Sequence, residues 1–119
     1  FTRPATPPPD IDLEAWLRTL ALIEALEPRW LCLTHFGAFD DVAFHLADFR
    51  ERLVRWADVV RTGLASGQSE AEQIAAFDAL GTAEAASLSA AQQVALTQQS
   101  GDLSLSWRGL ARYWQKRGA

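Results

Sequence analysis

Two histidines, His35 and His45, are the side chains of this chain with the clearest capacity for chemistry. His35 ends the short apolar run at residues 30–34 and is followed by Phe36 and Gly37. A neutral imidazole at a strand end can ligate a divalent metal, and the glycine lets the chain turn tightly beside it. One histidine cannot complete a metal site, so we expect a contribution to a site rather than a whole one. The alternative is a histidine hydrogen-bonded to the backbone.

His45 follows Asp41 by four residues, so the two side chains are expected to face each other on one helical turn. With His35 they could form a weak, adventitious metal or proton-transfer group, and otherwise they form an ordinary surface pair. Cys32 lies in the apolar run, where a core thiol is expected rather than a reactive one. The sequence contains no Ser-His-Asp order and no glycine-rich phosphate loop, and Gly109 is interpreted as helix punctuation.

Composition excludes several partners. The formal charge of −4 and the pI near 5.0 give no global attraction for nucleic acid, and no apolar run approaches the ~20 residues of a membrane helix. The single cysteine fits a reducing, cytoplasmic compartment. Four cations near the C-terminus suit the negative end of a helix macrodipole, with nearby tryptophans completing the core. They are Arg108, Arg112, Lys116 and Arg117.

Four of the five prolines fall within residues 1–9, which predicts an extended arm over residues 1–10. Apolar residues at helical spacing predict a helix at 13–26, which stops at Glu27 and Pro28. The apolar run at residues 30–34 is short enough for a buried strand. We find no second strand in the sequence, so this strand is predicted to be an orphan within the chain.

The remaining sequence predicts helices only. An apolar stripe with spacings of 4, 3, 4, 3 and 4 runs from Val42 to Val60, and Asp41 is its expected cap. The arginines between the stripe positions, including Arg52, are expected to be solvated. Ser69 and Glu72 match a capping box for a third helix, Ser87 or Ser89 can cap a fourth, and a fifth spans about 103–114. The fold class is therefore mostly α, with about five helices and one short strand.

The prolines at 7–9, the helix at 13–26, the run Leu-Cys-Leu-Thr-His-Phe-Gly at 31–37 and the long helix together resemble one family. They are similar to the C-terminal part of metallo-β-lactamase-fold, metal-dependent hydrolases. The resemblance implies that His35 is the last ligand of a dinuclear site in the complete enzyme, with zinc as the first expectation. Residues 11–40 would be the helix–strand remnant of the αββα fold, and residues 41–119 a helical C-terminal extension.

The sequence departs from that family because the His-x-His-x-Asp-His ligand motif is missing. The chain begins at Phe1 and contains no methionine, so we expect a fragment that is inactive alone and binds no metal by itself. Its partner would be the N-terminal remainder of the enzyme or a second copy. Apolar surface left without its sheet predicts a homo-oligomer. The competing interpretation is a self-contained helical interaction or oligomerisation module, and a small autonomous hydrolase is a remote third.

Overall fold

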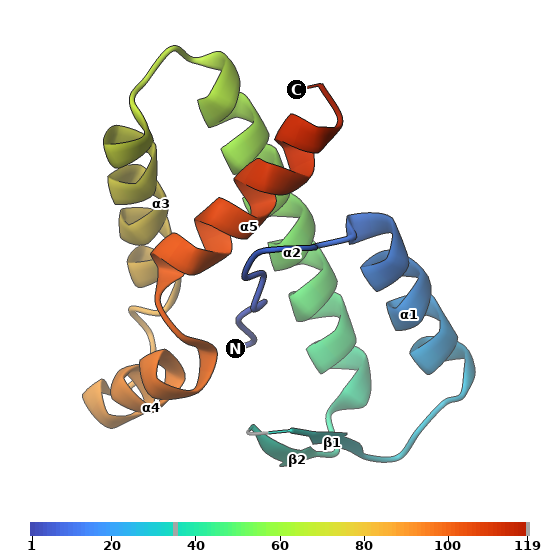
Figure 1. Ribbon diagram of the computed structural model, residues 1–119. Helices are drawn as coiled ribbons and strands as arrows, with labels where there is room; N and C mark the ends of the chain where they lie inside the picture. Colours follow the sequence, from blue (N-terminus) through green and yellow to red (C-terminus); the bar gives the residue numbers. More distant parts are fainter. Residues whose placement is uncertain (35, 119) are drawn as a thin grey trace.

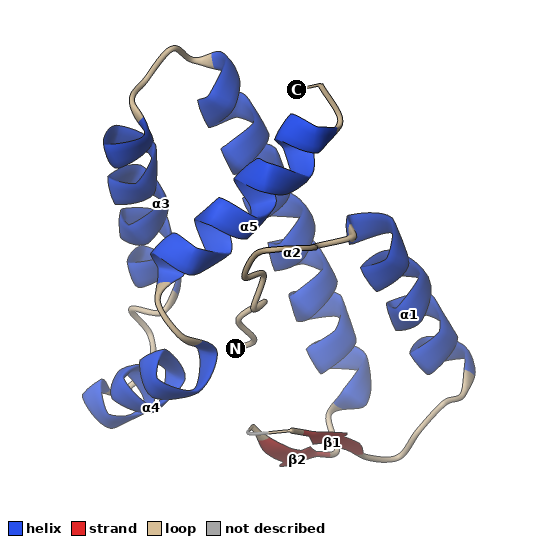
Figure 2. Ribbon diagram, viewed as in Figure 1, coloured by secondary structure: helices blue, strands red, loops and turns tan. Residues whose placement is uncertain are grey.

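The computed structural model describes residues 1–34 and 36–118, which form five helices and one β-hairpin (Figure 1). Figure 2 shows that helices dominate and that the hairpin lies at one end of the molecule. The mostly α fold class predicted from the sequence is confirmed. The elements are α1 (Leu13–Ala25), β1 (Leu31–Leu33), β2 (Gly37–Phe39), α2 (Val42–Ala65), α3 (Glu70–Glu84), α4 (Ala90–Ser100) and α5 (Leu103–Lys116).

Capping side chains explain where most helices begin. The Asp12 carboxylate accepts a hydrogen bond from the Ala15 amide at 2.9 Å, and Ser69 and Ser89 each form a capping box. Asp41 occupies the predicted cap position of α2, but its side chain makes no capping hydrogen bond. Its carboxylate instead lies 3.9 Å from Nδ1 of His45. The predicted hydrogen bond from this side chain to a backbone amide in the first turn of α2 is therefore not made.

The prediction of a strand at 30–34 is confirmed for Leu31–Leu33, but the expectation that it lacks a partner in the chain is wrong. β1 pairs antiparallel with β2, with Leu31 opposite Phe39 and Leu33 opposite Gly37. The partner strand was missed because it holds only three residues, of which two are glycine and alanine, so it carries no β signal of its own. The other edge of β1 has no strand beside it in the described part of the chain.

The main core lies where α3 and α5 pack on the C-terminal half of α2. The indole of Trp56 and the ring of Phe77 pack edge to face with centroids 5.0 Å apart, and both residues are almost fully buried. The predicted stripe on α2 is confirmed, since it supplies much of this core. A smaller cluster joins α1, β1 and the N-terminal half of α2 through Leu20, Leu31 and Leu46.

The proline-rich arm crosses the helices rather than extending away from them. Its first residues lie beside α2, and the segment then passes α5 before it enters α1 (Figure 1). Thr2, Pro4 and Thr6 are buried although the segment has no regular secondary structure. Proline-rich segments begin with little conformational freedom, so less entropy is lost when such a segment is held on a surface.

Among residues 1–34 and 36–118, no helix combines the length and the apolar character that crossing a bilayer requires.

Two leucines of α5 differ sharply in burial. Leu110 is fully buried, whereas Leu105 is 43% exposed. We expect Leu110→Ala to lower the free energy of unfolding by about 2–5 kcal/mol, because it leaves a cavity in the core. The same substitution at Leu105 should change it by about 0.5 kcal/mol or less. Urea denaturation of both variants tests this, and equal losses would contradict the assignment of the core.

Candidate functional site

His35, the predicted metal ligand, lies outside the described residues. The residues on either side of it belong to the hairpin, in which β1 ends at Leu33 and β2 begins at Gly37. Gly37 has φ of +99°, a conformation that residues with a side chain rarely adopt. The Phe36 amide donates to the Leu33 carbonyl at 3.2 Å and closes the turn.

His45 lies on the first turns of α2, directly beside this hairpin. Its ring packs on Phe39 of β2 with centroids 4.3 Å apart, and its Nδ1 lies 3.9 Å from an Asp41 carboxylate oxygen. The predicted facing of Asp41 and His45 is therefore confirmed. Burial lowers the pKa of His45 below its ordinary value, and the nearby carboxylates of Asp41 and Asp48 only partly oppose that effect. This burial against the hairpin therefore disfavours the charged form of His45.

A metal site needs at least three ligands that converge on one point. In the part of the chain that the structure describes, no group of three or more histidine, cysteine, aspartate or glutamate residues does so. Asp41 and His45 form a pair and nothing larger. The described residues therefore do not fit a complete metal centre, whether mononuclear or dinuclear.

Cys32 is exposed, so the expectation of a core thiol is wrong. Successive side chains of a strand point to opposite faces. Leu31 is buried against α1 and α2, so its neighbour Cys32 faces away from that cluster. Nothing in the described chain covers the second face of this two-stranded sheet at Cys32.

The cations of the C-terminal helix are engaged within the chain. Arg108 lies 3.5 Å from a Glu70 carboxylate oxygen, and Arg117 lies 3.3 Å from Glu14. Arg112 donates to the backbone carbonyl of Pro9 at 2.9 Å, and Lys116 pairs with Asp10. These ion pairs and this hydrogen bond therefore link the C-terminal helix to α3, to the arm and to α1. Trp107 is buried in the core, as the sequence predicted.

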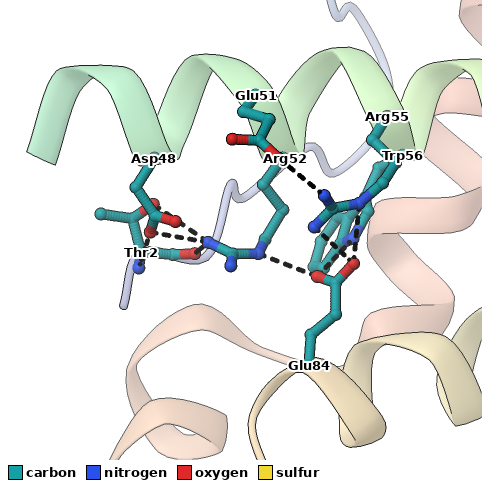
Figure 3. Close-up of polar contacts among 7 residues, drawn as sticks. All are labelled: Thr2, Asp48, Glu51, Arg52, Arg55, Trp56 and Glu84. Carbon is teal, nitrogen blue, oxygen red and sulfur yellow. Dashed lines mark hydrogen bonds and ion pairs between the residues drawn. The ribbon is translucent and has the colours of Figure 1, made fainter. Parts of the chain in front are cut away.

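A charged cluster that the sequence interpretation missed lies between α2, α3 and the arm (Figure 3). Its centre is Arg52, whose side chain is only 9% exposed. The guanidinium donates to Asp48 and to Glu84, both at 2.8 Å, and also to the backbone carbonyl of Thr2. These partners come from α2 itself, from α3 and from the arm. The expectation that Arg52 is solvated is therefore wrong.

Glu84 is the second centre of the cluster, as the dashed lines in Figure 3 show. Its carboxylate accepts from Arg52, from Arg55 and from the Trp56 indole, whose Nε1 donates at 3.1 Å. On the opposite side, the Thr2 amide and hydroxyl both donate to one Asp48 oxygen at 2.7 Å. Burial raises the Asp48 pKa, but the hydrogen bonds from Arg52 and Thr2 outweigh it and leave that pKa below its ordinary value.

The cluster is built to hold segments together. Each carboxylate accepts from donors inside the cluster, and the charged atoms of Arg52 point at partners rather than into a cavity. Such an arrangement offers neither a free base nor a nucleophile. A signal was present in the sequence, because Asp48 and Arg52 are four residues apart on the helix. Arg52 also lies four residues before Trp56, beside the apolar stripe.

Comparison with protein-family models, with curated proteins and with solved structures found no match to this chain.

Removing Arg52 should be costly. Arg52→Ala leaves two partly buried carboxylates and one backbone carbonyl without their donor, so we expect a loss of about 3 kcal/mol in the free energy of unfolding. Arg18 is an exposed arginine on α1, and Arg18→Ala should cost about 0.5 kcal/mol or less. Chemical denaturation of the two variants measures both losses in the free energy of unfolding. Similar losses would show that the cluster contributes nothing beyond a surface ion pair.

Burial of His45 makes stability depend on pH. Because its pKa is lower in the folded chain than in the unfolded one, the unfolded chain binds more protons as the pH falls below about 6.5. The free energy of unfolding should therefore decrease between about pH 7 and pH 5. His45→Gln should flatten this dependence relative to the wild type, as measured by urea denaturation at each pH. An identical slope in both proteins would rule out His45 as the source.

Proposed function

We propose that this chain is the C-terminal part of a metal-dependent hydrolase of the metallo-β-lactamase fold. In that role it supplies His35 as a ligand to a dinuclear, zinc-type centre and covers one side of the site with its helices. The chain is not catalytic alone under this proposal, because one histidine cannot complete a dinuclear site. The remaining ligands would come from the N-terminal remainder of the same enzyme.

One observation supports this proposal best. Helix α1 leads into β1, and β2 runs antiparallel to β1 before the chain enters α2. One edge of β1 has no strand beside it among the described residues, and the face at Cys32 is uncovered. A sheet edge with unpaired backbone groups is a template for a further strand. Under the proposal, this edge is where the sheet of the parent enzyme would continue.

Exposed apolar side chains support the same proposal. Leu22, Leu26 and Trp30, which we call the α1 apolar edge, are 67%, 78% and 58% exposed. Leu22 lies on α1 and Leu26 is the residue that caps its C-terminal end, four residues further on and therefore on the same face. Large apolar side chains exposed on a folded chain can mark a surface that association buries. The neighbouring part of the parent enzyme is the occupant that this proposal assigns to them.

The α1 apolar edge also favours a second candidate function. A self-contained helical module would use Leu22, Leu26 and Trp30 to form a homo-oligomer and would have no catalytic role. The two candidates differ in what lies upstream in the gene and in whether His35 affects metal content. They are therefore separable by one set of measurements on the protein that the intact gene encodes.

The test uses that intact gene product, with metal content measured by mass spectrometry and hydrolysis assayed on thioester, lactone and phosphoester substrates. We expect an upstream His-x-His-x-Asp-His motif, bound divalent metal, and a loss of metal affinity of at least about tenfold in His35→Ala. Hydrolysis should fall with it. The control His45→Ala changes a histidine of the same segment and should leave the metal content unaltered.

Two results would overturn the hydrolase proposal. One is a gene product without the upstream motif, and the other is a metal content that His35→Ala leaves unchanged. A metal-free homo-oligomer that Leu26→Glu and Trp30→Glu dissociate would instead establish the interaction module. Sedimentation velocity of the wild type and of these two variants provides that measurement.

A further inference from the structure

The proline-rich arm lies in a groove on the helical unit in the manner of a bound peptide. Thr2, Pro4 and Thr6 are buried, and Pro4 and Thr6 are among the most completely buried side chains of the chain. Ala5, between them, is exposed. An extended segment presents alternate residues to the surface beneath it, so every second side chain of the arm is buried against the helices.

The first half of this groove recognises Thr2. Its amide and hydroxyl both donate to Asp48 at 2.7 Å, and its carbonyl accepts from Arg52. The Arg52 guanidinium also lies 4.1 Å from the centre of the Phe1 ring. Hydrogen bonds to the backbone and to a hydroxyl group are typical of sites that bind short extended peptides.

The second half of the groove recognises Thr6. Its hydroxyl donates to the Ser106 carbonyl at 3.1 Å, and its amide lies 3.5 Å from the Ser106 hydroxyl. One helical turn further on, Gly109 allows the arm to touch the α5 backbone. A Cβ at position 109 would overlap the Thr6 carbonyl oxygen and lie 2.9 Å from the Pro7 carbonyl carbon. The groove therefore requires glycine at this point.

We propose that this groove, formed by Asp48, Arg52, Ser106 and Gly109, is a peptide-binding site that takes the arm of a second copy as well as the chain's own. The polar contacts of residues 1–9 are made by Thr2, Arg3, Thr6 and Pro9, so the same segment from another molecule can make the same ones. Exchange of an identical segment preserves every contact in the groove. The resulting assembly is an arm-exchanged oligomer, in which the arm acts as a latch between copies.

Effective concentration decides which arm fills the groove. A short connection to α1 holds the chain's own arm near the groove at about millimolar effective concentration. The arm of another molecule therefore enters when its concentration is comparable or when the resident arm cannot bind. The inference rests on contacts between described residues and is independent of the proposed hydrolase function. The α1 apolar edge takes no part in it.

Two variants of the 119-residue chain separate the groove from the arm. Gly109→Ala blocks the groove and leaves the arm intact, while alanine is itself favourable inside a helix. Pro4→Asp/Thr6→Glu disables the arm by placing carboxylates where buried side chains lie, and leaves the groove intact. Mixed in equal amounts, the intact arm of the first variant should enter the open groove of the second. Native mass spectrometry should then detect a heterodimer that neither variant forms alone.

A labelled peptide of residues 1–9 gives an independent measurement by fluorescence anisotropy. We expect it to bind Pro4→Asp/Thr6→Glu, and to bind the wild type and Gly109→Ala roughly tenfold more weakly or worse. Gly63→Ala is the matched control for Gly109→Ala. It also places alanine within a helix, and its Cβ would meet only the flexible end of Gln73. Combined with the arm variant, Gly63→Ala should leave peptide binding unchanged.

Circular dichroism establishes that each variant keeps its helices, and hydrogen exchange establishes that residues 2–6 of the arm variant are released. With both established, an absence of heterodimer and of peptide binding would overturn the proposal. Equal binding of the peptide to the arm variant with and without Gly109→Ala would overturn it as well, because the peptide would then bind elsewhere. A heterodimer together with Gly109-dependent peptide binding would confirm it.

Discussion

The burial of one guanidinium, that of Arg52, constrains the arrangement of three segments. Taking an ion out of water costs several kcal/mol, and only well-placed partners offset that cost. The partners of Arg52 lie on the arm, on its own helix and on α3, at Thr2, Asp48 and Glu84. Apolar contacts between helices tolerate small rotations, whereas charged hydrogen bonds of 2.8 Å do not. The cluster therefore fixes the positions of the arm and α3 relative to α2. With α3 held in this position, Phe77 packs on Trp56 of α2.

Helix α2 divides the molecule into two parts that differ in how fully they are covered. Its C-terminal half is buried by α3 and α5 in the main core, which contains Leu53, Val60 and Leu110. Its N-terminal half carries α1 and the hairpin on a much smaller cluster around Leu46. A small core stabilises less, because the apolar free energy scales with the area removed from water. The part that bears the candidate site is thus both the less buried part and the one with uncovered apolar side chains. That combination is consistent with a surface completed by another segment or molecule, whether the parent enzyme or a second copy.

Much of this fold could be predicted from the sequence because its signals are local. The apolar stripe from Val42 to Val60 and the capping box at Ser69 and Glu72 each involve residues within one helix, and both are confirmed. The hairpin failed as a prediction because pairing, rather than composition, makes Gly37–Phe39 a strand. The error at Cys32 followed from it, since an apolar neighbourhood in sequence does not say which face of a two-stranded sheet is covered. His35, the residue on which the functional prediction depends, lies outside the described residues.

The groove shows why the rest could not be predicted. Thr2 and Asp48 are 46 residues apart, and Arg52 and Glu84 are 32 residues apart, so no window of sequence contains either pair. A trace of the arrangement was nevertheless present at Gly109. Glycine within a helix costs about 1 kcal/mol relative to alanine, so one inside α5 needs a compensating contact. Interpreting it as punctuation was wrong, because α5 continues for seven residues beyond it to Lys116 and the missing side chain is what admits the Thr6 backbone. Considered separately, the proline-rich arm looks like an unstructured N-terminal segment and Gly109 looks like a helix break. In the structure they contact each other, because the arm packs on α5 at this glycine.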